Sequence, residues 1–151
     1  MKKYVISLAT VVLLFSCSSV KKSPYKSVDQ RDVPERYVND FKKKYADTDL
    51  QKVKWEMADS NTYFANFNTT DNDCKVKFTR TGTETYYVIP KDYVPSDITD
   101  FVKENYADYK IDDVYISDIK NQKSYEVSIK KKGETKKLQF DLRGNFNKVI
   151  D

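Results

Sequence analysis

The sequence predicts an α+β fold in which a helix followed by a four-stranded antiparallel sheet occurs twice, as a tandem repeat. We expect the two units to form one sheet of roughly eight strands with the helices on one face. Three observations predict this fold. Apolar residues have helical spacing at the start of each half, apolar and polar residues alternate over the segments that follow, and the two halves match each other in sequence.

A helix is expected at the start of each half because the apolar residues there fall on one stripe. The stripes consist of Tyr37, Val38, Phe41 and Tyr45 in the first half and of Ile98, Phe101, Val102 and Tyr106 in the second. Lys42, Lys43 and Lys44 lie near the end of the first helix, where positive charge interacts favourably with the helix dipole. Aromatic stripes are more typical of a core than of a cofactor pocket, so we expect both to be buried.

After each helix, apolar residues alternate with polar ones, which is typical of strands with one solvated face. The alternating segments are 53–57, 63–67, 74–78 and 86–89 in the first half, and 114–116, 125–129, 138–142 and 146–150 in the second. A lone unit of about 60 residues buries too little surface to be comfortably stable. We therefore expect the two units to lie side by side and to share one sheet.

The two halves match in the same order along the chain. The matching segments are Val33-Pro34 with Val94-Pro95, Tyr45-Ala46-Asp47 with Tyr106-Ala107-Asp108, Phe78 with Phe140, and Gly82 with Gly144. One inserted residue in the second half brings all of these matches into register. We expect a single folded domain over residues 33–151, composed of the repeats 33–90 and 94–151.

The N-terminus is typical of an exported bacterial lipoprotein. Two lysines precede an apolar run, residues 4–15, which is shorter than the roughly 20 residues that span a bilayer as a helix. The segment Leu14-Phe15-Ser16-Cys17 resembles the lipobox, in which the cysteine is acylated and becomes the N-terminus after cleavage. We expect residues 1–16 to be a signal peptide, and residues 17–32 to be the lipidated Cys17 with a flexible tether. An ordinary signal peptide that releases a soluble product is the alternative.

The expected location is the cell envelope, after export across the inner membrane. Residues 18–22 lack the acidic run that resembles surface-export signals in some lipoproteins, so we expect the outer membrane and its periplasmic side. Removal of residues 1–16 lowers the formal charge from +4 to +2, because two lysines and no acids are lost. A chain this mildly basic does not imply nucleic acid as a partner.

Composition argues against several kinds of chemistry. The chain contains 0 histidines, which excludes histidine-dependent triads, imidazole bases and histidine-containing zinc sites. Cys74 is the only thiol beyond Cys17, and we expect it to be a small apolar strand residue. The acidic segments 47–49 and 71–73 lack the spacing of a calcium loop and are typical of turns. We expect no catalytic residue, no metal site and no cofactor, and therefore no enzyme.

The candidate binding surface is the polar face of the predicted sheet. Its expected residues are three aromatic side chains and three lysines: Phe64, Tyr87, Tyr115, Lys54, Lys77 and Lys137. Aromatic rings surrounded by polar groups are common anchors in protein interfaces, so we expect this face to bind an unidentified envelope protein or peptide. A small molecule or glycan stacked on the rings is the alternative. A register shift of one residue would exchange the two faces.

These features together resemble a known family. The residues that carry the resemblance are Val-Pro before each helix, Tyr-Ala-Asp after it, Val53-Lys54-Trp55, and the closing segment 140–146. This pattern resembles the beta-lactamase-inhibitor-like, PepSY-like family of envelope lipoproteins. The resemblance implies a tandem helix-plus-four-strand architecture with a concave sheet, a location outside the cytoplasm, and no established enzymatic activity. A shared fold does not by itself supply a function.

Replacing Cys17 with Ala tests the predicted anchor. We expect the variant to lose labelling by a radioactive fatty acid and to lose its membrane association, because the acylated thiol is absent. Labelling followed by fractionation of the cells measures both effects. A variant that is still labelled and still bound to the membrane would contradict the prediction.

Overall fold

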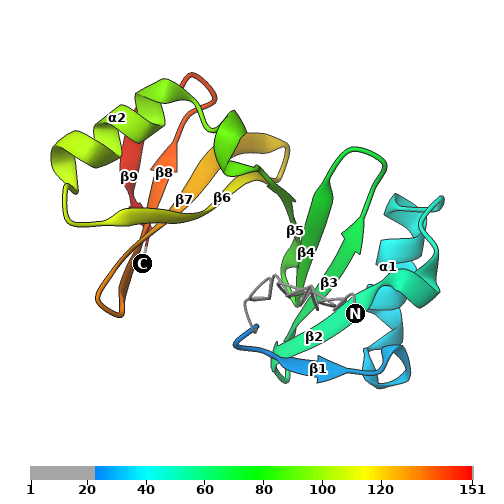
Figure 1. Ribbon diagram of the computed structural model, residues 1–151. Coiled ribbons are helices and arrows are strands. Elements are labelled where there is room, and N and C mark those ends of the chain that lie inside the picture. Colours follow the sequence, from blue (N-terminus) through cyan, green and yellow to red (C-terminus); the bar gives the residue numbers. More distant parts are fainter. Residues whose placement is uncertain (1–22, 151) are drawn as a thin grey trace, which may run out of the picture.

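The computed structural model describes residues 23–150. Their strands form one antiparallel sheet of nine strands in the order β1 to β9 (Figure 1). The strands are β1 (Lys26–Val28), β2 (Lys54–Asp59), β3 (Thr62–Asn68), β4 (Asp73–Thr79), β5 (Gly82–Val88), β6 (Lys110–Ile119), β7 (Gln122–Lys131), β8 (Glu134–Phe140) and β9 (Phe146–Ile150). Helix α1 (Glu35–Lys44) precedes β2, and helix α2 (Ser96–Asn105) precedes β6. Three short 3-10 helices cover Gln30–Asp32, Leu50–Lys52 and Lys91–Tyr93. The α+β class predicted from the sequence is confirmed.

The sheet has one strand more than the sequence indicates. Strand β1 lies within the segment expected to be a flexible tether, and it pairs with β2 along the edge of the sheet. Two of its three residues are exposed, so no alternation of apolar residues marks it in the sequence. The ordered chain therefore begins before Val33. The expected signal peptide, Cys17 and the first part of the tether lie outside the described residues.

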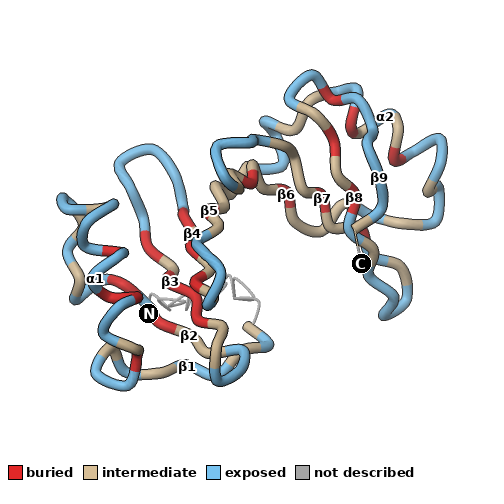
Figure 2. The backbone as a smooth tube through the Cα atoms, turned by 180° about the vertical axis from the view of Figure 1, so that it is seen from behind, coloured by how far each residue is buried: buried red, intermediate tan, exposed pale blue. Residues whose placement is uncertain are grey.

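The first apolar cluster lies between α1 and strands β2 to β4. Phe41 is fully buried, and its ring contacts those of Trp55 and Phe67 at centroid distances of 5.7 and 4.9 Å. Tyr37 and Val38 from the same helical stripe are also buried. Figure 2 shows the buried segments concentrated on the strands, whereas the turns are exposed. The stripe read from the sequence is therefore the core face of the helix.

A second apolar cluster packs under α2 and has no member in common with the first among the described residues. It combines Ile98 and Val102 of the helix with buried residues of β6, β7 and β8: Val114, Val127, Ile129, Leu138 and Phe140. Residues that pair directly across two antiparallel strands point to the same face of the sheet. Tyr87 packs against the first cluster and pairs with Ile116 of β6, two residues from Val114 of the second cluster. Both clusters, and therefore both helices, lie on the same face. The opposite face is left open.

A buried threonine connects α1 to the middle of the sheet. Thr85 of β5 is 0% exposed, and its Oγ1 accepts a hydrogen bond of 3.0 Å from Lys44 Nζ. The hydroxyl of Tyr45 lies 3.0 Å from the same oxygen. Buried polar groups are tolerated when they are hydrogen-bonded, so this contact fixes the end of α1 over β5.

No helix in the described part of the chain is long and apolar enough to cross a membrane.

Replacing Phe41 with Ala tests the first cluster. Because Phe41 is 0% exposed, we expect the free energy of unfolding to fall by about 3–5 kcal/mol, as for other buried Phe-to-Ala changes. Tyr93→Ala is the matched control, since Tyr93 is 77% exposed, and should change stability by no more than about 0.5 kcal/mol. Urea unfolding measures both variants. Equal losses in the two would contradict the assignment of the core.

Candidate functional site

The open face of the sheet has a hollow of about 330 Å³, which we call the open-face hollow. Strands β3 to β8 all contribute to it, and the chain just before β1 closes one side. Its lining residues are Pro24, Tyr25, Phe64, Lys75, Lys77, Tyr86, Asp113, Tyr115, Glu126, Ser128 and Lys137. Four of the residues expected from the sequence, Phe64, Lys77, Tyr115 and Lys137, are therefore brought together.

Tyr87 is the exception, because it lies on the helix-covered face. It pairs with the buried Cys74 and packs against the first apolar cluster, whereas its neighbour Tyr86 pairs with Lys75 and lines the hollow. The expectation that Tyr87 belongs to the open face is wrong. The run 86–89 is apolar on both faces, so alternation within β5 cannot decide which tyrosine faces the helices. The pairing of β5 with β4 decides that Tyr87 faces the helices and Tyr86 the open face.

Lys54 lies on the open face but outside the hollow. It is exposed and pairs with Asn66 near the β1 edge of the sheet. Asn66 in turn donates a hydrogen bond of 3.0 Å to Glu56, so this edge carries its own polar network. The sequence predicted the correct face for Lys54 but did not indicate that it lies apart from the hollow.

Phe64 lies on the expected face but is only 6% exposed. The ring of Tyr25 stacks on it at a centroid distance of 4.6 Å and an interplanar angle of 16°. Lys75 Nζ lies 4.2 Å from the centre of the Phe64 ring. Burial lowers the pKa of Lys75 from its usual value, with the acids Glu56 and Asp113 acting in the opposite direction. Tyr25 was missed because it lies in the segment read as a tether.

A carboxylate with two donors lies on the open face of β5, the middle strand of the sheet. Glu84 accepts a hydrogen bond of 2.7 Å from the Tyr86 hydroxyl and one of 3.0 Å from Lys77 Nζ. Burial alone would raise the pKa of Glu84, but these two donors outweigh it and lower the pKa. Burial, followed by the hydrogen bond to Glu84, raises the pKa of Tyr86 well above its usual value. Tyr86 is thus a neutral donor and Glu84 an anion at neutral pH.

The second half contributes a matching pair of aromatic and charged groups. The ring of Tyr115 meets that of Tyr86 edge to face, with 6.1 Å between the centroids. Lys137 Nζ lies 3.5 Å from Glu126 Oε1, and the Lys137 side chain is 52% exposed. Rings with polar neighbours therefore lie on both strands of the β5–β6 pair. Such a surface can hold an apolar group of a partner while hydrogen-bonding to polar groups around it.

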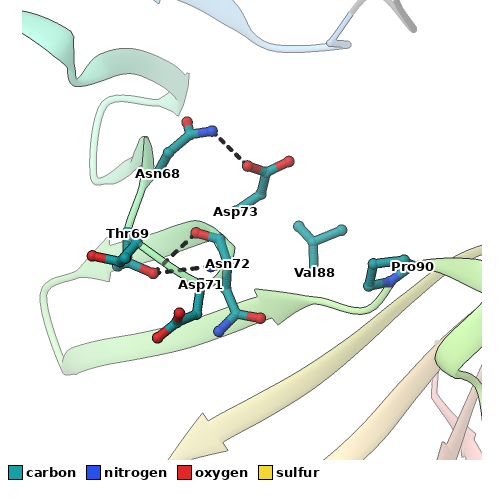
Figure 3. A pocket seen from close by; sticks show the side chains of 8 residues that line it. Asn68, Thr69, Asp71, Asn72, Asp73, Val88 and Pro90 are labelled. Carbon is teal, nitrogen blue, oxygen red and sulfur yellow. Dashed lines mark hydrogen bonds between the residues drawn. The ribbon is translucent and has the colours of Figure 1, made fainter.

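A second hollow, of about 320 Å³, lies beside the turn between β3 and β4 (Figure 3). Its polar side chains stabilise the turn itself. Asn68 donates a hydrogen bond of 2.6 Å to Asp73, and the backbone nitrogen of Asn72 donates one of 3.1 Å to Thr69 Oγ1. Asp49, in the other acidic segment, accepts a hydrogen bond from the backbone of Gln51. Within residues 23–150 no group of three metal-ligating side chains occurs. Both acidic segments therefore act here as turn formers.

Residues 19–83 and residues 61–148 each match the beta-lactamase-inhibitor-like, PepSY-like family, and the chain belongs to this family. No curated protein matches the sequence.

Two solved structures from Bacteroides are similar to the chain. A BLIP-like protein from Bacteroides fragilis NCTC 9343 is 22% identical, covers 79% of this chain and 86% of that chain, and has a TM-score of 0.58. A candidate calcium-regulated periplasmic protein from Bacteroides thetaiotaomicron is 24% identical, covers 83% of this chain and 96% of that chain, and has a TM-score of 0.35. The first similarity supports the fold.

The Tyr86–Glu84 contact makes stability depend on pH. Because the pKa of Glu84 is lower in the folded chain than its ordinary value of 4.5, its contribution is present above that pH and is lost as the pH falls through the folded pKa. Tyr86→Phe removes the donor and should lower the free energy of unfolding by about 1 kcal/mol at pH 7. The difference from the wild type should shrink in acid.

Urea unfolding at neutral and acid pH measures this effect, and NMR titration of the Glu84 carboxyl carbon measures its pKa directly. Tyr86→Phe should raise the pKa of Glu84, whereas Tyr93→Phe, at an exposed position, should leave it unchanged. A loss of stability that is the same at both pH values would assign the effect to packing instead.

Proposed function

We propose that this protein is a non-catalytic lipoprotein of the cell envelope that binds another protein or a peptide through the open face of its sheet. The observation that carries the proposal is the open-face hollow, where Phe64, Tyr86 and Tyr115 lie among charged side chains from both halves. Aromatic anchors with a polar surround are the usual composition of protein interfaces. The helices occupy the other face and therefore do not block this one.

A small molecule or glycan is the second candidate ligand. Stacked rings favour it, but the volume of about 330 Å³ is at the lower end of ligand pockets, which hold about 300–1,000 Å³. The hollow also spreads over six strands, which suits a partner with an extended surface. Thermal unfolding in the presence of sugars and of peptides separates the two candidates, because a ligand that binds the folded state raises its stability.

The proposed location is the periplasmic side of the outer membrane, reached by export and anchored by a lipid on Cys17. The basic and apolar N-terminus and the lipobox-like segment 14–17 support it. Membership of a family of beta-lactamase-inhibitor-like proteins is consistent with a role in modulating an extracytoplasmic enzyme or assembly. The proposed partner is an envelope protein or peptide, and the mild basicity of the chain does not imply nucleic acid.

We also infer that the domain arose by duplication of one unit of a helix and four strands. The order α1 then β2–β5 recurs as α2 then β6–β9. The shared Val-Pro and Tyr-Ala-Asp sequences, at the same places before and after each helix, support the inference. On this view the open-face hollow forms where two equivalent sheets meet.

Photo-crosslinking in intact cells tests the proposed face. A photoreactive amino acid in place of Tyr115 or Lys137 should capture a defined envelope protein, because both positions line the hollow. The matched control is Asp100 on α2, whose side chain is 60% exposed on the other face. It should not capture that protein. Equal capture from both faces would contradict the proposal.

Substitution then measures the contribution of the hollow. With the captured partner purified, Tyr115→Ala should weaken binding by about tenfold or more, the effect of losing a buried aromatic anchor. Tyr93→Ala, at an exposed site away from the hollow, should leave the affinity unchanged. Isothermal calorimetry measures both variants.

A further inference from the structure

The N-terminal segment of the chain covers an aromatic site on its own open face. Phe64 pairs with Glu56 and Lys77, so its side chain belongs to the solvated face of the sheet. It is nevertheless only 6% exposed, because the ring of Tyr25 lies almost parallel to it, 4.6 Å away. The two rings belong to segments that are far apart in the sequence. Burial of Phe64 thus depends on where the N-terminal segment lies.

A lysine completes this site. Lys75 Nζ lies 4.2 Å from the centre of the Phe64 ring and 5.0 Å from that of Tyr25. An ammonium group is attracted to the face of an aromatic ring, and the attraction is stronger where water is excluded. Phe64 and Lys75 together therefore favour an aromatic occupant. An aliphatic side chain would lose the interaction with the ammonium, and a carboxylate would lose the stacking.

Within the described residues, the ring of Tyr25 stacks on no ring other than that of Phe64. Tyr25 does not belong to either apolar cluster, and its backbone nitrogen donates 3.3 Å to Ser23, within the same segment. The strand that follows, β1, has three residues, lies at the edge of the sheet and pairs with β2. Because Tyr25 precedes β1, its ring can leave the open face while β1 stays paired with β2 and Val28 stays packed against the first apolar cluster.

We propose that Tyr25 occupies, in the free protein, the place that an aromatic side chain of the partner takes in the complex. The N-terminal segment and the partner then compete for the Phe64–Lys75 site, which lies within the open-face hollow. This inference rests on the proposed function, since it names the chemistry of one contact on the same face. In competition of this kind, the apparent Kd of the partner equals its intrinsic Kd divided by the fraction of molecules in which the site is open.

The test uses p-cresol, the side-chain analogue of tyrosine, and the full mature chain with Cys17→Ala so that it stays in solution without lipid. Titrations are followed by NMR at the signals of Phe64 and Lys75. In Tyr25→Ala the site is uncovered, and we expect saturable shifts with an apparent Kd at least about fivefold lower than in the parent chain. Tyr25→Phe keeps the covering ring and should behave as the parent chain does.

Cyclohexanol, a ring of similar size without π electrons, is the ligand control and should bind Tyr25→Ala more weakly than p-cresol. Equal binding of the two, shifts away from Phe64 and Lys75, or the same p-cresol affinity in Tyr25→Ala and the parent would each overturn the proposal. If Tyr25→Ala does not fold, the parent chain decides. Excess p-cresol should then move the Tyr25 signals towards those of a released segment, and static Tyr25 signals would refute the competition.

This experiment contains no partner, so its failure differs from failure of the proposed function. Capture of a partner at Tyr115 without p-cresol binding at Phe64 would leave the binding face standing and reject the competition. Binding of p-cresol to Tyr25→Ala without any captured partner would support the covered aromatic site and count against the proposed function.

Discussion

Strands β5 and β6 pair antiparallel over five residue pairs, from Glu84 with Ile119 to Val88 with Tyr115, and this pairing joins two halves that each have an apolar cluster of their own. Each half alone, at about 60 residues, would bury too little surface for comfortable stability. The same pairing sets the faces of the combined sheet. It places Tyr86 beside Tyr115 and so creates the open-face hollow from residues of both halves.

The parts of the fold that are determined locally could be predicted from the sequence. Phe41 and Ile98 are fully buried because helical spacing places each on the apolar side of its own helix, and this spacing is visible without knowledge of the rest of the chain. Alternation identified the buried side of β4 in the same way, with Cys74, Val76 and Phe78 facing the core. The family followed from short sequences at the ends of these elements, and it is confirmed by the match over residues 19–148.

The rest depends on contacts between distant segments. Strand β1 has no apolar pattern of its own and is ordered by pairing with β2. The choice between Tyr86 and Tyr87 depends on the register of β5 against β4, because the surrounding run is apolar on both sides. For the candidate site, the sequence placed Phe64 and Tyr115 on the correct face, but it could not indicate that Tyr25 covers Phe64.

The position of Tyr25 limits the distance between the Phe64 site and a lipid attached at Cys17. It is eight residues after Cys17, and a chain extends at most about 3.3–3.6 Å per residue. In a chain anchored at Cys17 and closed over Phe64, the covered site lies within roughly 30 Å of the lipid attachment point. Release of β1 as well, which would also remove Val28 from the first apolar cluster, would move the first fixed point of the fold to Val33 and about double that reach. A partner that displaces Tyr25 together with β1 would thus also allow the domain to stand farther from the membrane.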